Sequence, residues 1–390
     1  MPNLRMGIAG LGMASRQILP YFEKIPYIQA AAAADIRKES LKAFQEKYAG
    51  KVFESVKEMC ESPDIDAVWI ATPNLHHADH AIMAAENGKH IICEKPLAVT
   101  LEECDRMIEA AERNKVKLLQ GHSKIYEPAI KKMREIVAGG ELGRLLQINT
   151  FNYRNWILRP RVDVEVDTAR GGGIVYNQGP HQTDVVRCIG GGVVKSVRAN
   201  AGRWDSHFDC EIGYTAFLEL ADGTPATMTI NGYGYFDITE LTWDIGEGGT
   251  KVTRSPSKLA RHKGPVDPAT KYSGPVHWGA SDSSDGERYQ PFYGLTIVSC
   301  EKGDIRQSPD GLYVYTIEGV REVPCPPSRG RGAELIELHE AITQDRPVFP
   351  DGKWGKASLE VVLAILKSSR EKKEITLSHQ VSYPSRLEES

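Results

Sequence analysis

The sequence lacks any apolar run that approaches the roughly 18 residues needed to span a bilayer. It also lacks a charged leader followed by a long apolar segment, since MPNLRMGIAG leads directly into a strand-like run. With a formal net charge of -4, it has no excess of basic residues for a phosphate backbone. We therefore expect a cytoplasmic protein without a membrane or nucleic-acid partner.

Cysteine pairs at metal-binding or redox spacing are absent as well. The seven cysteines are an odd number, widely scattered, and none forms a C-x-x-C pair. This argues against a disulfide framework and against a cysteine zinc site. At 390 residues, the chain is too long for one ordinary hydrophobic core, so its length predicts two domains.

Short apolar runs alternate with amphipathic stretches through the first third of the chain. The apolar runs are LRMGIAG, IQAAAAAD, AVWIAT, HIIC and VKLLQG, and a helix-like segment follows each of the first four. Alternation at this spacing predicts a parallel sheet with helices on both faces. We interpret residues 1–122 as a doubly wound α/β domain.

The pattern changes in residues 123–390, which we interpret as a second α/β domain. After a predicted helix at 128–140, strand-like segments at 145–153, 193–204, 210–220, 225–236 and 238–247 indicate a mostly antiparallel sheet. Residues 255–290 show no period and predict a long surface loop. The domain is completed by strands at 295–300 and 312–317 and by two helices. Whether the closing helix packs back near the first domain is left open.

A glycine turn follows the first predicted strand. Residues 10–15 match the dinucleotide fingerprint, with serine in its third glycine position. In that fingerprint, Gly10 makes the tight turn, and Gly12, Met13 and Ala14 lie where backbone approaches a pyrophosphate. The match is weak alone, but the preceding strand and the following helix support a nucleotide site.

An acidic residue ends the second predicted strand. The carboxylate of Asp35 could accept hydrogen bonds from ribose hydroxyls and would repel a 2′-phosphate, which favours NAD over NADP. Arg37 weakens this preference, because its guanidinium could hold that phosphate instead. NAD is therefore the predicted cofactor, and NADP remains open.

Polar residues also follow two other predicted strands. Thr72, Asn74 and His77 come after AVWIA, and Glu94 and Lys95 come after HIIC. Ligands of such sheets bind outside the carboxyl ends of the strands, so these residues are candidate cofactor contacts. The alternative is that charged residues followed by proline simply end a strand.

Two histidines stand one helical turn apart in the same region. His76 and His80 have a spacing that metal sites use, but no acidic third ligand follows at suitable spacing. We expect a capping or cofactor-contact role and predict no metal.

A second chemical centre lies at residues 167–184, DTARGGGIVYNQGPHQTD. Pro180 suggests the start of a helix, which would place His181 and Asp184 on one face. Histidine suits proton transfer near neutral pH, and the carboxylate could orient it. His181 is therefore the candidate general base.

Arginines gather just before this segment. Guanidinium groups bind carboxylates in bidentate fashion, so several of them would suit an acidic substrate. The acidic residues between them could instead pair with them on a solvated loop. The candidates are Arg154, Arg159, Arg161 and Arg170, with Asp163, Glu165 and Asp167 interleaved.

Taken together, AGLGMAS, AAAAD, ATPNLHHADHAIMAAENGKHIICEKPLA and GGGIVYNQGPHQTD resemble the Gfo/Idh/MocA family of NAD(P)-dependent oxidoreductases. The resemblance covers nearly the whole chain and is most specific at E-K-P. It implies an N-terminal Rossmann domain and a C-terminal α/β domain whose open, mostly antiparallel sheet walls the substrate site. Homodimers or homotetramers are implied as well.

The resemblance also implies roles for individual residues. Lys95 would reach the reacting hydroxyl, where an ammonium stabilises a developing alkoxide, and Glu94 would help to hold the nicotinamide ribose. His181 would act as general base. The chain departs from the common pattern at Asn177, where many members carry aspartate. It departs again at His122, a candidate substrate contact where an asparagine-arginine-rich turn is usual.

The chain resembles one branch of this family, the phthalate 4,5-cis-dihydrodiol dehydrogenases. The resemblance lies in GHS after the sixth predicted strand, RPR followed by DTARGGG, the Gln178-x-x-His181-Gln182-x-Asp184 pattern, IVSCEKGDIRQSPDG and DGKWGKASLEV. This implies oxidation of a ring cis-diol bearing two carboxylates to 4,5-dihydroxyphthalate, with arginines holding the carboxylates. A dehydrogenase of a sugar, inositol or glycoside hydroxyl remains an equal alternative. A nucleotide-sensing or scaffold protein without turnover is a third hypothesis, which the presence of both Lys95 and His181 disfavours.

Overall fold

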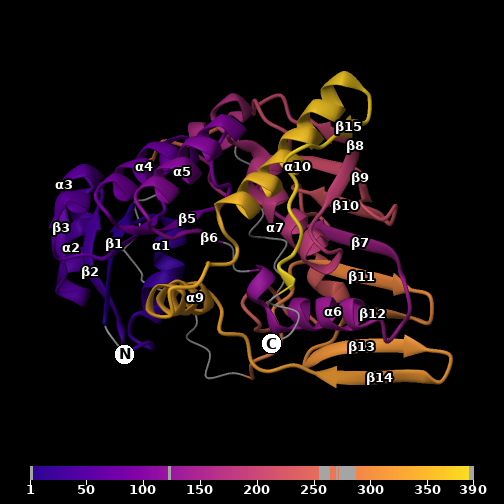
Figure 1. Ribbon diagram of the computed structural model, residues 1–390. Helices are drawn as coiled ribbons and strands as arrows, with labels where there is room; N and C mark the ends of the chain where they lie inside the picture. The colour runs from indigo at the N-terminus through magenta and orange to yellow at the C-terminus, as the bar shows by residue number, and fades with distance from the viewer. Residues whose placement is uncertain (1–2, 122–123, 254–263, 269–270, 272–286, 386–390) are drawn as a thin grey trace. The chain divides into compact units, whose positions relative to one another are not determined.

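A computed structural model describes residues 3–121, 124–253, 264–268, 271 and 287–385 (Figure 1). Among these, residues 3–121 and 330–359 form one compact unit. The second unit contains residues 124–253, 264–268, 271, 287–329 and 360–385. No helix of the described residues is long and apolar enough to cross a membrane.

The first unit is built on a six-stranded parallel sheet in the order β3-β2-β1-β4-β5-β6. Its strands are β1 (Leu4–Ala9), β2 (Ile28–Ala34), β3 (Lys51–Phe53), β4 (Ala67–Ile70), β5 (His90–Glu94) and β6 (Leu118–Gly121). All four residues of β4 are buried, because helices cover both faces of a parallel sheet. The order reverses beside β1, and this confirms the predicted doubly wound fold.

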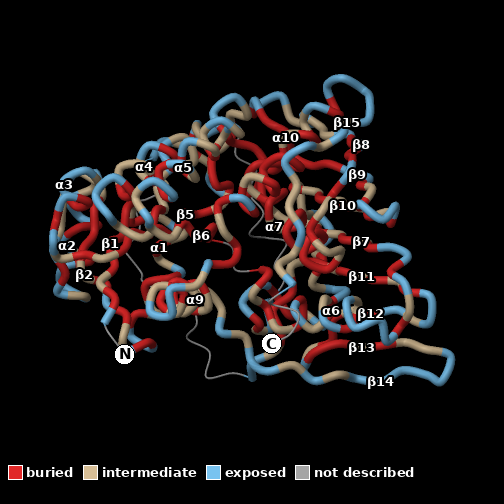
Figure 2. The backbone as a smooth tube through the Cα atoms, in the orientation of Figure 1, coloured by how far each residue is buried: buried red, intermediate tan, exposed pale blue. Residues whose placement is uncertain are grey.

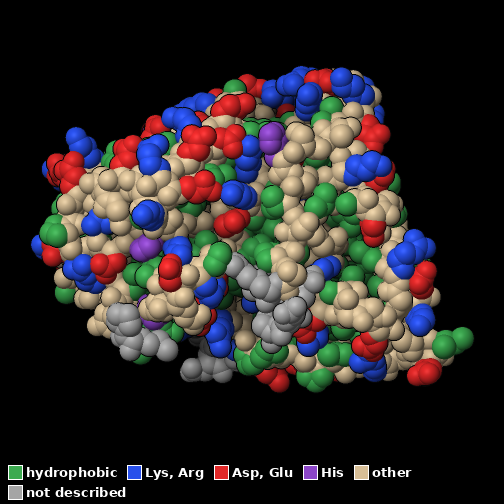
Figure 3. All heavy atoms as spheres, viewed as in Figure 1, with side chains coloured by type: hydrophobic (Ala, Val, Ile, Leu, Met, Phe, Trp, Pro, Cys, Tyr) green, Lys and Arg blue, Asp and Glu red, His purple; other side chains and the backbone are tan. Residues whose placement is uncertain are grey.

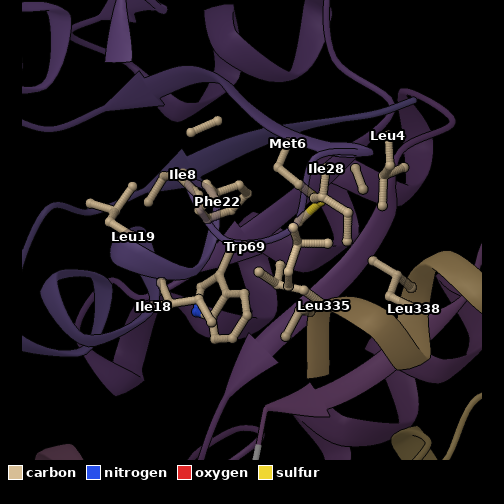
Figure 4. Packing of buried hydrophobic residues seen from close by; sticks show 14 of the residues in the cluster. Leu4, Met6, Ile8, Ile18, Leu19, Phe22, Ile28, Trp69, Leu335 and Leu338 are labelled. Carbon is tan, nitrogen blue, oxygen red and sulfur yellow. The ribbon is translucent and has the colours of Figure 1, made fainter. Parts of the chain in front are cut away.

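Helices pack on both faces of this sheet. They are α1 (Met13–Ile18), α2 (Lys38–Tyr48), α3 (Val56–Glu61), α4 (His77–Glu86), α5 (Leu101–Arg113) and α9 (Gly332–Thr343). Figure 4 shows the core on one face, where Met6, Ile8 and Trp69 from the strands meet Ile18 of α1 and Leu335 of α9. Residues 330–359, far away in the sequence, therefore complete the core of the first unit.

The second unit contains a nine-stranded sheet in the order β14-β13-β12-β11-β7-β10-β9-β8-β15. Its strands are β7 (Leu145–Tyr153), β8 (Val194–Gly202), β9 (Gly213–Leu220), β10 (Pro225–Asn231), β11 (Leu295–Cys300), β12 (Gly303–Gln307), β13 (Gly311–Thr316), β14 (Gly319–Pro324) and β15 (Ile375–Thr376). Strands β7 and β10 pair in parallel, and the other neighbouring pairs are antiparallel. The predicted open, mostly antiparallel sheet is confirmed.

Helix α7 (Gly173–Ile189) lies against one face of this sheet, beside α6 (Pro128–Gly139). Figure 2 shows α7 as a mostly buried element. Gln182 fastens it to the sheet, since its amide donates to Thr150 Oγ1 at 3.2 Å and its carbonyl accepts from Tyr214 OH at 2.6 Å. Helix α10 (Gly352–Glu371) belongs to the first unit through Leu359 and to the second from Glu360.

The structure corrects two local predictions. Residues 238–247 do not form a strand, because the Asp237 side chain accepts from Thr239 N–H at 3.0 Å and starts a short 3₁₀ helix, Ile238–Leu241. Pro180 does not begin a helix either, because it lies inside α7, which starts seven residues earlier. Burial of almost every side chain of α7 outweighs the low helix propensity of its glycines and proline.

Candidate functional site

The glycine turn after β1 has the backbone and the open space that a dinucleotide needs. Gly10 has a φ of +88°, and a Cβ there would lie 2.9 Å from the carbonyl oxygen of Ala71. At Gly12, by contrast, a Cβ would meet nothing within 4 Å. Met13 and Ala14 begin α1, and Met13 is 59% exposed. A pyrophosphate could therefore approach this backbone closely.

Asp35 lies next to the glycine turn and holds Arg37. Its carboxylate accepts from Leu11 N–H at 2.6 Å and from the Arg37 guanidinium at 2.9 and 3.0 Å. Burial raises the pKa of Asp35, but the hydrogen bonds from Arg37 and Leu11 outweigh it and leave the pKa below its usual value. A 2′-phosphate would have to compete with Asp35 for the guanidinium, and this arrangement fits NAD.

The loop after β4 brings Thr72 and His77 together. His77 is 1% exposed, and its Nε2 lies 2.9 Å from the carbonyl oxygen of Thr72. Asn74 starts a 3₁₀ helix, Asn74–His76, that leads into α4. The Thr72 hydroxyl contacts His80 Nδ1 at 3.0 Å, and burial lowers the pKa of His80 to about 4. These residues form one hydrogen-bonded loop at the carboxyl end of β4.

Glu94 ends β5 beside this loop, and Lys95 follows it. The Lys95–Pro96 peptide bond is cis. Glu94 is 5% exposed and accepts a hydrogen bond from Arg331, whose guanidinium lies over the Trp69 ring at 5.1 Å. Sequence reasoning missed Arg331, because 237 residues separate it from Glu94.

Lys95 differs in burial from its neighbours. Among residues 91–98, Lys95 is of intermediate exposure, and the seven remaining residues are all buried. The turn therefore presents one ammonium group from an otherwise buried segment. Such a group can stabilise negative charge that develops on a bound substrate.

In the second unit, exposure along α7 singles out two predicted residues. Between residues 171 and 189, only Asn177 and His181 are of intermediate exposure, and the others are buried. They are four residues apart and therefore share one face of the helix. The Asn177 amide oxygen accepts from Trp156 Nε1 at 2.9 Å, so this face adjoins the loop after β7.

Asp184 follows His181 by three residues in α7. It is fully buried, and its carboxylate lies 3.8 Å from Arg187, which is also fully buried. Arg187 in turn donates to the carbonyl oxygen of Gly192 at 2.8 Å. This buried ion pair supports the packing of α7, and the orienting role predicted for Asp184 toward His181 stays a prediction.

Two aromatic rings connect the His181 face of α7 to the arginines. The His181 and Tyr293 rings are 5.0 Å apart, and Arg154 lies 5.4 Å from the centre of the same tyrosine ring. Arg161 lies 4.4 Å from the centre of the Trp156 ring, which also contacts Asn177. Burial raises the pKa of Tyr293 to about 12, although Arg154 opposes this.

Three of the four predicted arginines pair with carboxylates. Arg154 contacts Glu247, Arg161 lies 3.9 Å from Glu165, and Arg170 lies 2.8 Å from Asp163. The Arg170 pair is exposed on both sides, with 47% and 77% of the two side chains accessible. Arg161 and Arg170 thus meet acids that are interleaved with them in the sequence. Arg154 instead pairs with an acid 93 residues away.

Arg159 is the exception. Its Nε donates to Asn155 Oδ1 at 2.9 Å, and it contacts no carboxylate among the described residues. Arg159 is exposed as a whole residue. Partial desolvation of its guanidinium, followed by the charge of Arg154, lowers the pKa of Arg159. An anion beside Arg159 would relieve this repulsion between guanidinium groups.

We define the cationic cluster as Arg154, Arg159, Arg161 and Lys271 with the carboxylates of Glu165 and Glu247. Lys271 contacts Glu165, and burial of the ammonium lowers the pKa of Lys271. Within this set of described residues, four cations thus face two carboxylates. A ligand carboxylate could accept hydrogen bonds from Arg159, which contacts no carboxylate of the described residues.

Other predicted features lie outside these groups. His122 and most of the 255–290 segment are not among the described residues. Within the described part of the chain, no group of three histidine, cysteine or acidic side chains could hold a metal ion. Figure 3 shows acidic and basic side chains interspersed on the visible face.

Comparisons with known proteins place the chain among oxidoreductases. A family model described as an oxidoreductase family with an NAD-binding Rossmann fold matches residues 4–122, and the Gfo/Idh/MocA C-terminal domain model matches residues 130–245. A solved structure from Bordetella bronchiseptica RB50 has a TM-score of 0.85 and 37% identity, covering 96% of this chain and all of that one.

Curated relatives carry names with different substrates. The 1-carboxy-3-chloro-3,4-dihydroxycyclo hexa-1,5-diene dehydrogenase of Comamonas testosteroni is 33% identical over 94% of this chain and 95% of that protein. The myo-inositol 2-dehydrogenase of Thermotoga maritima is 30% identical over 50% of this chain and 58% of that protein. From the two family models and the full-length relative, we conclude that the chain belongs to the Gfo/Idh/MocA family and is an NAD-dependent oxidoreductase.

Proposed function

We propose that the enzyme oxidises a carboxylated cyclohexadiene cis-diol to the corresponding catechol, with phthalate 4,5-cis-dihydrodiol as the first substrate to test. The observation that carries this proposal is the cationic cluster, which contacts the same tyrosine and tryptophan rings as His181 and Asn177. A ring diol with a carboxy group also appears in the name of the Comamonas relative. A second carboxylate on the ring, as in phthalate, would strengthen the attraction to this cluster.

The proposed chemistry assigns one task to each of two residues. NAD, when bound, supplies the acceptor for the hydride that leaves the ring carbon. The Lys95 ammonium stabilises the negative charge that develops on the hydroxyl oxygen, and His181 accepts the hydroxyl proton. The resulting hydroxy-ketone tautomerises to an aromatic catechol, and aromatisation makes the oxidation effectively one-way.

A second candidate substrate class is a sugar, inositol or glycoside hydroxyl. The inositol dehydrogenase among the relatives favours it. In this case the arginines would serve only as ion pairs of the protein.

The test is the appearance of reduced nicotinamide with purified enzyme and NAD. Phthalate 4,5-cis-dihydrodiol, a neutral cyclohexadiene cis-diol and a panel of sugars, inositols and glycosides would be compared at equal concentration. We expect rapid reduction with the carboxylated diol, and a KM that rises with salt because the attraction is electrostatic. Reduction by a carbohydrate alone would refute the diacid assignment and select the second class.

We also propose that the enzyme forms homodimers or homotetramers through the sheet face opposite α7. A row of cross-strand neighbours, Phe217, Thr227, Asn149 and Ile297, lies on that face and is not buried within the chain. Phe217 is 47% exposed. A second copy of the chain would remove this apolar surface from water.

Sedimentation velocity tests this assembly. We expect a dimer or tetramer at micromolar concentration, and a larger monomer fraction after Phe217→Lys combined with Ile297→Lys. Only monomer in the unmodified protein would refute the proposal.

The cytoplasmic location expected from the sequence stays a prediction.

A further inference from the structure

His77 links the two loops that follow β4 and β5. Its Nδ1 lies 2.9 Å from the carbonyl oxygen of Pro96, and its Nε2 lies 2.9 Å from the carbonyl oxygen of Thr72. The ring is 1% exposed and belongs to the first residue of α4. One side chain therefore contacts both loops at the carboxyl ends of neighbouring strands.

Both ring nitrogens of His77 face carbonyl oxygens, and this limits the further hydrogen bonds that the imidazole can make. A neutral imidazole donates one N–H and a protonated one donates two, so its tautomer decides which carbonyl receives the bond. Burial lowers the pKa of His77, while the carbonyls of Pro96 and Thr72, and then the Glu94 carboxylate, raise it. A hydrogen bond from this ring to a cofactor would require one of the two backbone contacts to be given up.

The two residues that flank Lys95 are both held from outside the turn. On one side, Arg331 donates to Glu94 and also lies 3.2 Å from Glu334. On the other side, His77 contacts the carbonyl of Pro96. Both flanking residues are buried, whereas Lys95 is partly exposed. The backbone that carries Lys95 is therefore fixed at both ends.

We propose that His77 is a positioning residue for Lys95, holding the Pro96 carbonyl against the Thr72 loop so that the ammonium is presented in one orientation. This inference rests on the proposed role of Lys95 in the reaction. Removal of a residue that orients a reacting group typically lowers the reaction rate about 10- to 100-fold, because a displacement of about 1 Å of that group slows the reaction. His77 would thus act on turnover and not on cofactor affinity.

The experiment measures kcat, KM and NAD affinity for His77→Ala and His77→Gln. The substrate is whichever compound of the diol and carbohydrate panel reduces NAD, and NAD binding is followed without substrate by tryptophan fluorescence. We expect kcat to fall 10- to 100-fold in His77→Ala, with KM and the NAD dissociation constant changing less than threefold. His77→Gln should recover part of the loss, since its amide can donate to a carbonyl.

His90→Ala is the matched control. His90 begins the strand that Glu94 ends, and it also bonds to backbone, accepting from Lys117 N–H at 3.0 Å. This variant should keep kcat within twofold. Should His77→Ala fail to fold, as judged by thermal melting, His77→Gln carries the test, with an expected fall in kcat of at least threefold.

A double variant separates positioning from general destabilisation. If His77 acts through Lys95, adding His77→Ala to Lys95→Met should lower kcat less than twofold further, because the group being positioned is gone. The inference would be overturned if the fall in kcat of the double variant equalled the product of the falls in the two single variants. A folded His77→Ala with full kcat, or a loss confined to NAD affinity, would overturn it as well. An active Lys95→Met would instead show that the proposed role of Lys95 has failed.

Discussion

Replacement of Lys95 by methionine should lower kcat by a factor of roughly 10²–10³ while the enzyme still binds NAD. This range is typical for loss of one group that stabilises an oxyanion. Methionine keeps the length and the apolar part of the lysine side chain but cannot donate a hydrogen bond. Because Lys95 is partly exposed and its neighbours are buried, the substitution should leave the fold of the turn intact.

The measurement combines steady-state kinetics with calorimetric titration of NAD. Lys353→Met is a suitable control, because Lys353 belongs to the first unit and forms an exposed ion pair with Glu112 at 3.0 Å. Exposed pairs of this kind contribute little, so kcat should stay within twofold. Full turnover in Lys95→Met would refute the assigned role, and loss of NAD affinity by more than tenfold would reassign Lys95 to cofactor binding.

Sequence patterns predicted the first domain better than the second. The apolar runs of β1, β2, β4 and β5 stand between glycine, charged and helical segments, so strand and helix periods separate clearly. In the second domain, local hydrogen bonding and burial override such patterns. The Asp237 side chain turns an apparent strand into a 3₁₀ helix, and packing extends α7 through a glycine-rich segment.

The candidate site was predictable where a motif carries it. Glycine turns, Asp35, Lys95 and His181 follow from short sequence patterns whose chemistry is explicit. Arg331 does not, because it meets Glu94 only through the packing of α9 against the parallel sheet. The pairing of Arg154 was equally unpredictable, since its partner Glu247 lies 93 residues away. Long-range ion pairs depend on tertiary structure, which single-sequence periodicity does not report.

Arg159→Gln should raise the KM for a carboxylated diol roughly 10- to 150-fold with a smaller change in kcat. A hydrogen bond to a charged group contributes about 1.5–3 kcal/mol, which corresponds to that range. The carboxylate does not react, so its binding energy is shared by ground state and transition state and should appear in KM. Arg170→Gln should have a weaker effect, because Asp163 already balances that guanidinium at the surface.

The decisive comparison uses the neutral cyclohexadiene diol as a second substrate. If Arg159 holds the carboxylate, its replacement should leave the KM for the neutral diol within twofold. The difference in KM between the carboxylated and the neutral diol should then become small. Arg144→Gln, an exposed arginine 3.4 Å from Glu301, should change neither KM. Equal losses with both diols would instead mean that Arg159 supports the fold of the loop after β7. A selective loss would connect the Arg159 guanidinium to recognition of the substrate carboxylate.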